Sequence, residues 1–157
     1  MTYTIRNCEK KDLPVLIELC KAHADYERTA YNGQGKLPRL EAALFAEQPV
    51  LFCWVVEVDG TVVGYTAYVF EFTTWDAGYL LFMDCLYLLP PYRGFGIGRD
   101  IMQRLMAVAQ QKGCVAIEWQ TPQFNEDGIR FYKKLGAEGK DKVRFAWPVG
   151  GVKGEGF

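Results

Sequence analysis

Residues 90–102 read PPYRGFGIGRDIM, with a glycine at every second position from Gly94 to Gly98. The stretch joins an apolar run at 78–89 to a periodic apolar run that is typical of a helix and extends to about Lys112. Glycine weakens regular structure by roughly 0.5–1 kcal/mol relative to alanine, so three in five residues are a poor choice for packing alone. We therefore expect a strand, then a turn that needs bare backbone, then a helix.

The backbone N–H groups of such a turn can point at one centre. The unpaired N–H groups of the first helical turn and the helix dipole favour an anion there, typically a phosphate or pyrophosphate. The spacing is not G-x-G-x-x-G, because Arg99 stands where the third glycine would be, and no G-K-[ST] follows. A flexible connection without a ligand is the alternative, and the flanking Arg93 and Arg99 favour the anion site.

The segments on both sides of this stretch alternate between strand and helix patterns. Strands are expected at 3–8, 50–58, 61–72, 78–89, 115–120 and 142–149, and helices at 12–24, 37–47, 98–112 and 125–135. Asp12 is a good N-cap for the first helix, and the Asp59-Gly60 pair predicts a hairpin. The order predicts a single α/β domain around a mixed sheet over residues 1–149, with a flexible tail at 150–157.

Composition excludes several function classes. The chain has 157 residues, a net charge of −1 and no Lys/Arg-rich block, so we expect no nucleic-acid partner. Five spaced cysteines without a CxxC pair, and one histidine, predict no metal site and a reducing, cytoplasmic location. The N-terminus lacks an apolar signal core, and no apolar run approaches the roughly 20 residues that a membrane helix needs.

Two motifs carry a resemblance to a known family. YRGFGIG at 92–98 resembles the R-x-x-G-x-G/A acetyl-CoA signature of the GCN5-related N-acetyltransferase (GNAT) superfamily. NEDGIRFYKKLGA at 125–137 resembles that superfamily's late segment, an asparagine followed by a helix with an aromatic-Tyr pair. Within that superfamily the chain resembles the diamine, or spermidine/spermine-type, N-acetyltransferases, which share a Tyr-Glu pair (here Tyr26-Glu27) and a T-aromatic-D stretch (here TWD at 74–76). The resemblance implies a mostly antiparallel twisted sheet of six to seven strands flanked by about four helices.

The resemblance also implies an acetyl-CoA site. The pantetheine arm lies beside the central strand in this superfamily, in the manner of an added strand. The implied contacts are Leu86, Tyr87 and Leu88 along the strand, Arg93, Gly94, Phe95, Gly96, Ile97, Gly98 and Arg99 around the phosphates, and Asn125 and Tyr132 near the pantetheine. Hydrophobicity alone assigns Leu86, Tyr87 and Leu88 to the core, and capping alone would explain Asn125.

Acetyl transfer to an amine poses two proton problems. An alkylammonium with a pKa near 10.4 is only about 0.04% neutral at pH 7, so a base must accept a proton. By resemblance Asp84 is that base, directly or through water; a strand aspartate paired with a cation is the alternative. The leaving thiolate needs a proton donor, and by resemblance that donor is Tyr132; a core aromatic is the alternative.

Tyr26, Glu27 and Asp84 are the expected acceptor contacts, because an aromatic face and carboxylates suit a cationic chain. A surface glutamate without function is the alternative for Glu27. Trp75, Asp76 and Trp119 are further candidates for this cleft, and His23 is expected at the surface or at a helix end.

The leading hypothesis is acetyl transfer to a small primary amine, such as a diamine, polyamine or lysine-like amine. A protein or peptide acceptor, and a non-catalytic acyl-CoA-binding module, are the other two. The resemblance further implies a homodimer.

Overall fold

The structure, a computed structural model, describes residues 1–151. Its strands and helices are β1 (Thr4–Asn7), α1 (Leu13–Tyr26), α2 (Lys36–Phe45), β2 (Phe52–Val58), β3 (Thr61–Thr73), β4 (Gly78–Leu88), α3 (Ile97–Gln111), β5 (Ala116–Glu118) and α4 (Glu126–Lys134). Three 3-10 turns, η1 (Lys10–Asp12), η2 (Pro90–Tyr92) and η3 (Val149–Gly151), complete the described part. All four expected helices are present close to their expected bounds.

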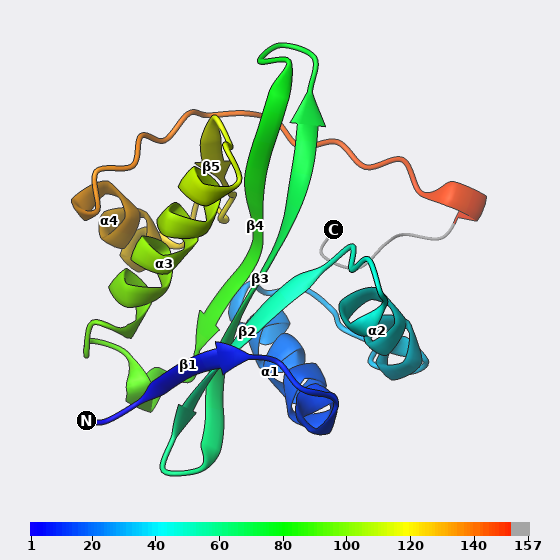
Figure 1. Cartoon of the computed structure of the whole chain (residues 1–157), viewed down its shortest axis with the longest axis vertical. Helices are drawn as coiled ribbons and strands as arrows, with labels where there is room; N and C mark the ends of the chain where they lie inside the picture. The colour runs from blue at the N-terminus through cyan, green and yellow to red at the C-terminus, as the bar shows by residue number, and fades with distance from the viewer. Residues whose placement is uncertain (152–157) are drawn as a thin grey trace.

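The strands form one mixed sheet in the order β1-β2-β3-β4-β5 (Figure 1). The first four strands are antiparallel neighbours, and β5 runs parallel to β4 after the crossover through α3. Asp59 and Gly60 both have positive φ, 49° and 77°, the backbone of the tight turn that their pairing predicted. The α/β class and the central hairpin are therefore confirmed.

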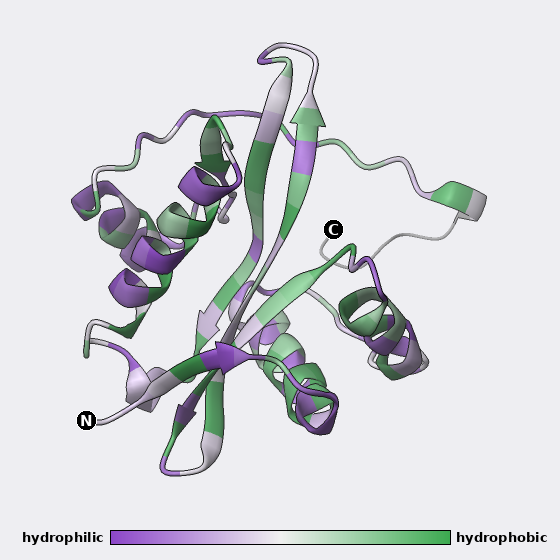
Figure 2. Cartoon of the chain, viewed as in Figure 1, coloured by the Kyte–Doolittle hydropathy of each residue, from purple (hydrophilic) through white to green (hydrophobic). Residues whose placement is uncertain are grey.

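Helices cover both faces of the sheet. Helices α1 and α2 lie on one face, where Leu13, Leu16 and Leu19 pack against the buried side chains of β2 and β3. Helix α3 lies on the other face with Ile97, Ile101 and Leu105 against β4, and α4 packs beside it. Burial of each such aliphatic side chain stabilises the fold by roughly 1.5–3 kcal/mol. Figure 2 shows the hydrophobic middle of β3 and β4 between these layers.

Helix α1 begins where expected, but the reason differs from the sequence-based one. Asp12 precedes the helix, yet its side chain makes no capping hydrogen bond to it. The buried carboxylate instead accepts hydrogen bonds from Arg6 at 2.7 and 3.0 Å and from the backbone N–H of Glu9 at 2.8 Å. Because Arg6 also binds Glu57, this cluster ties β1 and β2 to the start of α1.

The expectation of six to seven strands is wrong for residues 1–151, in which the sheet has five strands. The segment at 142–149 alternates apolar residues as a strand does, but it pairs with no strand. Strand β5 is only three residues long, and the segment runs away from that edge toward the α2 side (Figure 1), so it has no neighbour to pair with. Most of the expected tail, residues 152–157, lies outside the described residues.

Candidate active site

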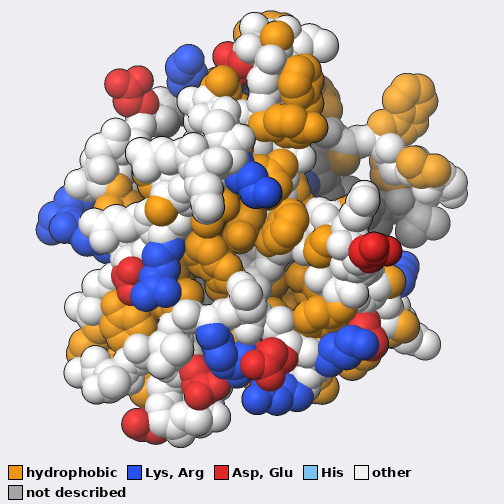
Figure 3. Space-filling model, viewed as in Figure 1, with side chains coloured by type: hydrophobic (Ala, Val, Ile, Leu, Met, Phe, Trp, Pro, Cys, Tyr) orange, Lys and Arg blue, Asp and Glu red, His pale blue; other side chains and the backbone are white. Residues whose placement is uncertain are grey.

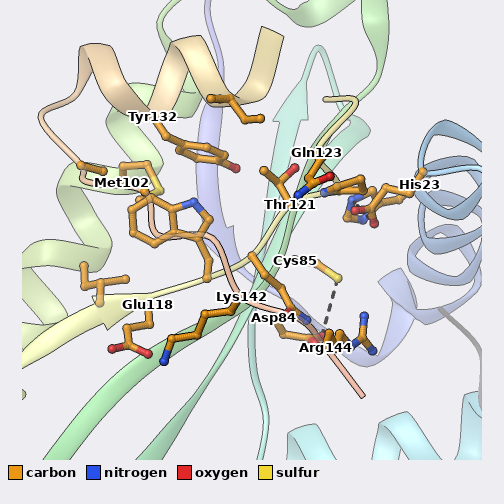
Figure 4. A pocket seen from close by; sticks show the side chains of 18 of the residues that line it. His23, Asp84, Cys85, Met102, Glu118, Thr121, Gln123, Tyr132, Lys142 and Arg144 are labelled. Carbon is orange, nitrogen blue, oxygen red and sulfur yellow. Dashed lines mark hydrogen bonds and ion pairs between the residues drawn. The ribbon is translucent and has the colours of Figure 1, made fainter. Parts of the chain in front are cut away.

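A cleft of about 2160 Å³ opens between the end of α1, the middle of β4, β5 and the two late helices. Figure 4 shows its side chains, and Figure 3 shows the hydrophobic side chains that gather along the middle of the molecule. Four of the expected site residues line this cleft: Glu27, Asp84, Arg99 and Tyr132. Trp75 and Trp119 also line it, whereas Asp76 lies in the β3–β4 turn, where it is bonded to Thr73.

Strands β4 and β5 separate along one side of the cleft. Their pairing is confined to three rungs, from Leu80–Ala116 to Phe82–Glu118, although β4 continues to Leu88. Beyond Phe82 the edge of β4 that faces β5 therefore has no strand partner among the described residues. Leu86, Tyr87 and Leu88 lie on this unpaired part. Apart from the Leu88 carbonyl, which accepts a hydrogen bond from Arg93, this edge can accept an extended ligand such as a pantetheine arm. The side chain of Tyr87 itself is buried in the core.

The glycine segment has the backbone that an anion cradle needs. Gly94 and Gly96 have φ of 84° and 83°, which disfavour other residues, and a Cβ built on either would meet nothing within 4 Å. Gly96 precedes α3 as its N-cap and contributes no side-chain cap, so the first-turn N–H groups remain available. Open space and free N–H groups fit the diphosphate of acetyl-CoA.

Gly98 serves a different purpose from the two glycines before it. A Cβ on Gly98 would lie 3.1 Å from Cζ of Phe131, so this glycine lets α4 pack closely on α3. The neighbouring Ile97 buries its side chain in the core, and Phe95 is half exposed. The alternating pattern GFGIG thus combines two open backbone positions with one close helix contact.

The two arginines beside the glycines have different surroundings. Arg99 lines the cleft. Arg93 donates from Nε to the carbonyl oxygen of Leu88 at 2.8 Å, and its guanidinium lies over the rings of Tyr26 and Tyr87, 5.0 and 5.3 Å from their centroids. Arg93 therefore holds the end of β4 against α1, and its contact with a phosphate stays a prediction.

Tyr132 projects from α4 into the cleft, and Figure 4 shows its hydroxyl group pointing toward the middle of the cavity. Its ring packs against Trp119 and Phe131, with centroid distances of 5.0 and 5.1 Å. Burial, followed by the negative potential of Glu27, raises the pKa of Tyr132 to about 12. The phenol therefore carries its proton at neutral pH.

Asp84 owes its position to a β-bulge. Met83 pairs with Tyr68 and Cys85 pairs with Ala67, so Asp84 is the extra residue on β4. A bulge re-aims a side chain, and here it directs the carboxylate to the cleft wall opposite Tyr132 (Figure 4). Desolvation raises the pKa of Asp84, and the Cys85 thiol, 3.6 Å from Oδ2, acts in the opposite direction.

Tyr26 and Asn125 join α1 to α4. The Tyr26 hydroxyl donates to Oδ1 of Asn125 at 2.6 Å, and the same oxygen accepts the N–H of Gly128 at 3.2 Å. The Asn125 amide also donates to Thr121 at 2.7 Å. The expected cap of α4 is thus confirmed, while contacts of Asn125 and Tyr26 with ligands stay predictions. Gly128 leaves the room for this cap, since a Cβ there would lie 2.3 Å from Asn125.

His23 lies in the last turn of α1, at the helix end that was one of its two expected positions, and its side chain is only 15% exposed. The ring stacks on Tyr87, with centroids 5.1 Å apart. Nδ1 lies 3.2 Å from the Tyr65 hydroxyl, and Nε2 lies 3.3 Å from Oε2 of Glu27. Sequence reasoning missed His23 and Tyr65; the one available signal was the i,i+4 spacing of His23 and Glu27.

Among residues 1–151, no cluster of three His, Cys, Asp or Glu side chains could hold a metal ion. In the same part of the chain, no helix combines the length and the apolar character needed to cross a membrane.

Comparisons with known proteins agree with this geometry. The model of the acetyltransferase (GNAT) family matches residues 16–137. The thialysine N-epsilon-acetyltransferase of Mus musculus is 30% identical over 142 residues, which cover 85% of this chain and 83% of the relative. The spermidine/spermine N(1)-acetyltransferase-like protein 1 of Homo sapiens is 26% identical over 86% of this chain, but only 20% of that protein is covered.

Solved structures show the same fold. An aminoglycoside N-acetyltransferase in complex with CoA superposes with a TM-score of 0.76 at 20% identity, covering 94% of this chain and 95% of that chain. The glycine turn, the separated strands β4 and β5, and the family match over most of the sequence lead to one conclusion. The chain belongs to the acetyltransferase (GNAT) family.

Proposed function

We propose that the protein transfers the acetyl group of acetyl-CoA to a primary amine of a small molecule. The observation that carries this proposal is the convergence of Asp84 and Tyr132 on one cleft, beside the unpaired part of β4. A carboxylate with a raised pKa and a protonated phenol are the two proton-handling groups that direct acetyl transfer requires.

Acetyl-CoA supplies a thioester whose carbonyl carbon accepts the amine nitrogen. The unpaired backbone of Leu86 to Leu88 would hold its extended arm, and the N–H groups around Gly94 and Gly96 would hold its diphosphate. A backbone N–H of β4 beside the carbonyl would stabilise the negative charge that develops on its oxygen. In the overall reaction a C–N bond forms and the C–S bond breaks. The ammonium nitrogen loses two protons, one before it attacks and one as the amide forms; one of them ends on the thiol and the other is released to solvent.

Asp84 is the group that would accept a proton from this nitrogen. Its raised pKa brings the carboxylate closer to the ordinary range of a base that works near neutral pH. Aspartate is shorter than glutamate, so a water molecule between Asp84 and the amine fits this role.

Tyr132 would act at the leaving sulfur. With a pKa of about 12 the phenol keeps its proton until a thiolate develops, and then donates a hydrogen bond to it. A free thiol has a pKa near 8.5, so complete transfer from Tyr132 is uphill and the hydrogen bond is the main contribution. The sulfur then takes up a proton as the thiol leaves.

The acceptor we propose is a diamine, a polyamine or a lysine-like amine. Glu27 and Asp84 both line the cleft, which suits a chain that carries a second positive charge. The relatives' names, thialysine and spermidine/spermine acetyltransferases, support the same class. A peptide acceptor would favour a groove without acidic lining, so this observation favours the small amine.

A thiol-release assay tests the proposal. Purified protein, acetyl-CoA and a panel of diamines, polyamines, thialysine, amino acids and peptides are mixed, and free CoA is followed with time. We expect small diamines or lysine-like amines to accelerate CoA release well above hydrolysis. If only peptides accelerate CoA release, the protein is a protein or peptide acetyltransferase instead. If no acceptor accelerates it, only a role in acyl-CoA binding remains.

We also propose that the protein is a homodimer. Three apolar residues of the segment after α4, Val143, Phe145 and Trp147, alternate along a stretch without helix or strand and are 77–96% exposed. The same stretch of a second copy can cover these exposed apolar side chains, and a net charge of −1 does not oppose association. Light scattering should give twice the chain mass, and Trp147→Lys should lower it. A monomeric wild type would contradict this proposal.

Two expectations from the sequence are kept as proposals: residues 1–149 form one catalytic domain, and the spaced cysteines indicate the reducing cytoplasm.

A further inference from the structure

A polar network of side chains underlies the acceptor end of the cleft and is not used by the chemistry described above. It runs from Glu27 through His23 to Tyr65, whose hydroxyl lies near the thiols of Cys20 and Cys85. Cys85 in turn lies against Asp84, with Sγ 3.6 Å from Oδ2. The network therefore connects the two carboxylates that line the cleft.

His23 is an uncharged member of this network. Burial, followed by the positive charge of Arg93, lowers the pKa of His23 to about 4. At neutral pH the 3.3 Å contact between Nε2 and Oε2 of Glu27 therefore joins a neutral imidazole, rather than an imidazolium, to the carboxyl group. The groups that face the ring are Glu27 at the end of α1, Tyr65 on β3, Tyr87 on β4 and Arg93 after β4.

The two contacts of the ring favour one position for its single proton. An ionised carboxylate only accepts hydrogen bonds, so the nitrogen that faces Glu27, Nε2, must carry the proton. Nδ1 is then the acceptor and receives the Tyr65 hydroxyl at 3.2 Å. Tyr65 is suited to donate, because the residue is buried and burial raises its pKa well above the ordinary value, so the phenol keeps its proton.

We propose that His23 is a positioning residue for acetyl transfer: its neutral ring, bonded to Tyr65, holds the Glu27 carboxylate in place for the acceptor amine. This inference rests on the proposed function, because it assigns Glu27 to the acceptor. Glu27 keeps 30% of its side-chain surface and lines the cleft, so a carboxylate held from behind by His23 still faces the substrate. Fixing one rotamer-rich side chain in advance improves binding of the amine rather than the chemical step.

The first test does not need activity. His23 is the only histidine in the sequence, so tag-free protein labelled with 15N-histidine gives one imidazole spectrum. We expect a neutral ring with the proton on Nε2 from pH 8 down to pH 5.5. Glu27→Gln and Tyr65→Phe should each shift the ring nitrogens, whereas Tyr68→Phe, on the same strand but in the other core cluster, should not. A ring that titrates near pH 6.5, or that carries its proton on Nδ1, would overturn the proposal.

The second test is kinetic. His23→Leu should raise KM for the amine about tenfold with kcat nearly unchanged, and His23→Gln, which has an acceptor and an N–H donor, should recover most of the loss. In a Glu27→Gln background, His23→Leu should cause no further rise, because His23 acts through Glu27. Additive effects, or equal losses in the leucine and glutamine variants, would show a merely structural role.

The two tests also separate the proposals. A wild type that turns over no amine removes the proposed function, while the imidazole spectrum still decides whether the network is as described. If His23→Leu does not fold, Tyr65→Phe, which removes only a hydroxyl group, replaces it in the cycle with Glu27→Gln.

Discussion

The two ends of the cleft are built in different ways. The donor end uses backbone from one continuous stretch, the end of β4 and the glycine turn that precedes α3. The acceptor end uses side chains from distant parts of the chain, such as Glu27, Tyr65 and Asp84. A backbone site can be encoded in a short motif, whereas a side-chain site exists only after the sheet has formed.

The largest effect is expected at Tyr132, the proposed proton donor to the leaving sulfur. Tyr132→Phe should lower kcat by about 10²-fold, because the hydroxyl group acts mainly in the transition state. Acetyl-CoA affinity, measured by titration calorimetry, should remain unchanged, since the ring still packs on Trp119. Tyr79→Phe, at the half-exposed tip of β4, is the matched control. Equal turnover in the two variants would reject the role of Tyr132.

Asp84→Asn tests the acceptor end. We expect a loss of about 30-fold in kcat/KM at pH 7, at the lower limit of general-base effects because water can replace part of the function. The base must be ionised and its pKa is raised, so wild-type kcat/KM should fall as the pH drops through a value above the ordinary 3.8. The asparagine variant should lack this acidic limb. Asp59→Asn, in the β2–β3 turn, should keep the wild-type profile.

Gly96→Val tests the donor end. A β-branched residue at a φ of 83° is strained, and its side chain enters the open cradle, so we expect acetyl-CoA affinity to fall about tenfold. Gly113→Val introduces similar strain at a φ of 69°, far along the chain at the end of α3. If both variants lose affinity equally, strain rather than the cradle explains the loss.

Gly98→Ala should have the smallest effect. It should distinguish the packing role of Gly98 from the anion-binding role of Gly94 and Gly96. The added Cβ lies 3.1 Å from Phe131, and the crowding is partly offset by the better helix propensity of alanine. We expect a stability loss of about 1 kcal/mol in chemical denaturation with acetyl-CoA affinity unchanged. In a Phe131→Leu background the stability loss should shrink; a large affinity loss would assign Gly98 to the cradle instead.

The contrast between the two ends also explains what could be predicted from the sequence. The glycine turn and the helices follow from local patterns, since Gly94 and Gly96 have the positive φ that their type suggests. Asp84, Tyr132 and Glu27 were named through the resemblance, and the structure brings all three to one cleft. His23 and Tyr65 were not identified from the sequence, because their contact joins α1 to β3 and no local pattern encodes such a contact.

The prediction of a sixth strand at 142–149 was wrong for a related reason. Alternating apolar residues at 142–149 satisfy the local requirement of a strand, but a strand also needs a neighbour of sufficient length. Strand β5 extends over only Ala116–Glu118, and its short length cannot be deduced from the apolar pattern of 115–120.

The bulge on β4 has a consequence for how this site can vary. Upstream of Asp84, Leu81 and Met83 point to the α3 layer, and downstream of it the odd-numbered Cys85 and Tyr87 point to the α1 layer. The extra residue Asp84 therefore changes which layer the odd-numbered side chains of β4 face. Met83 and Cys85 already oppose the consecutive residues Tyr68 and Ala67. Deleting Asp84 would therefore leave the later side chains of β4 in their present layers and remove only the carboxylate, so the extra residue serves the cleft rather than the packing of the strand.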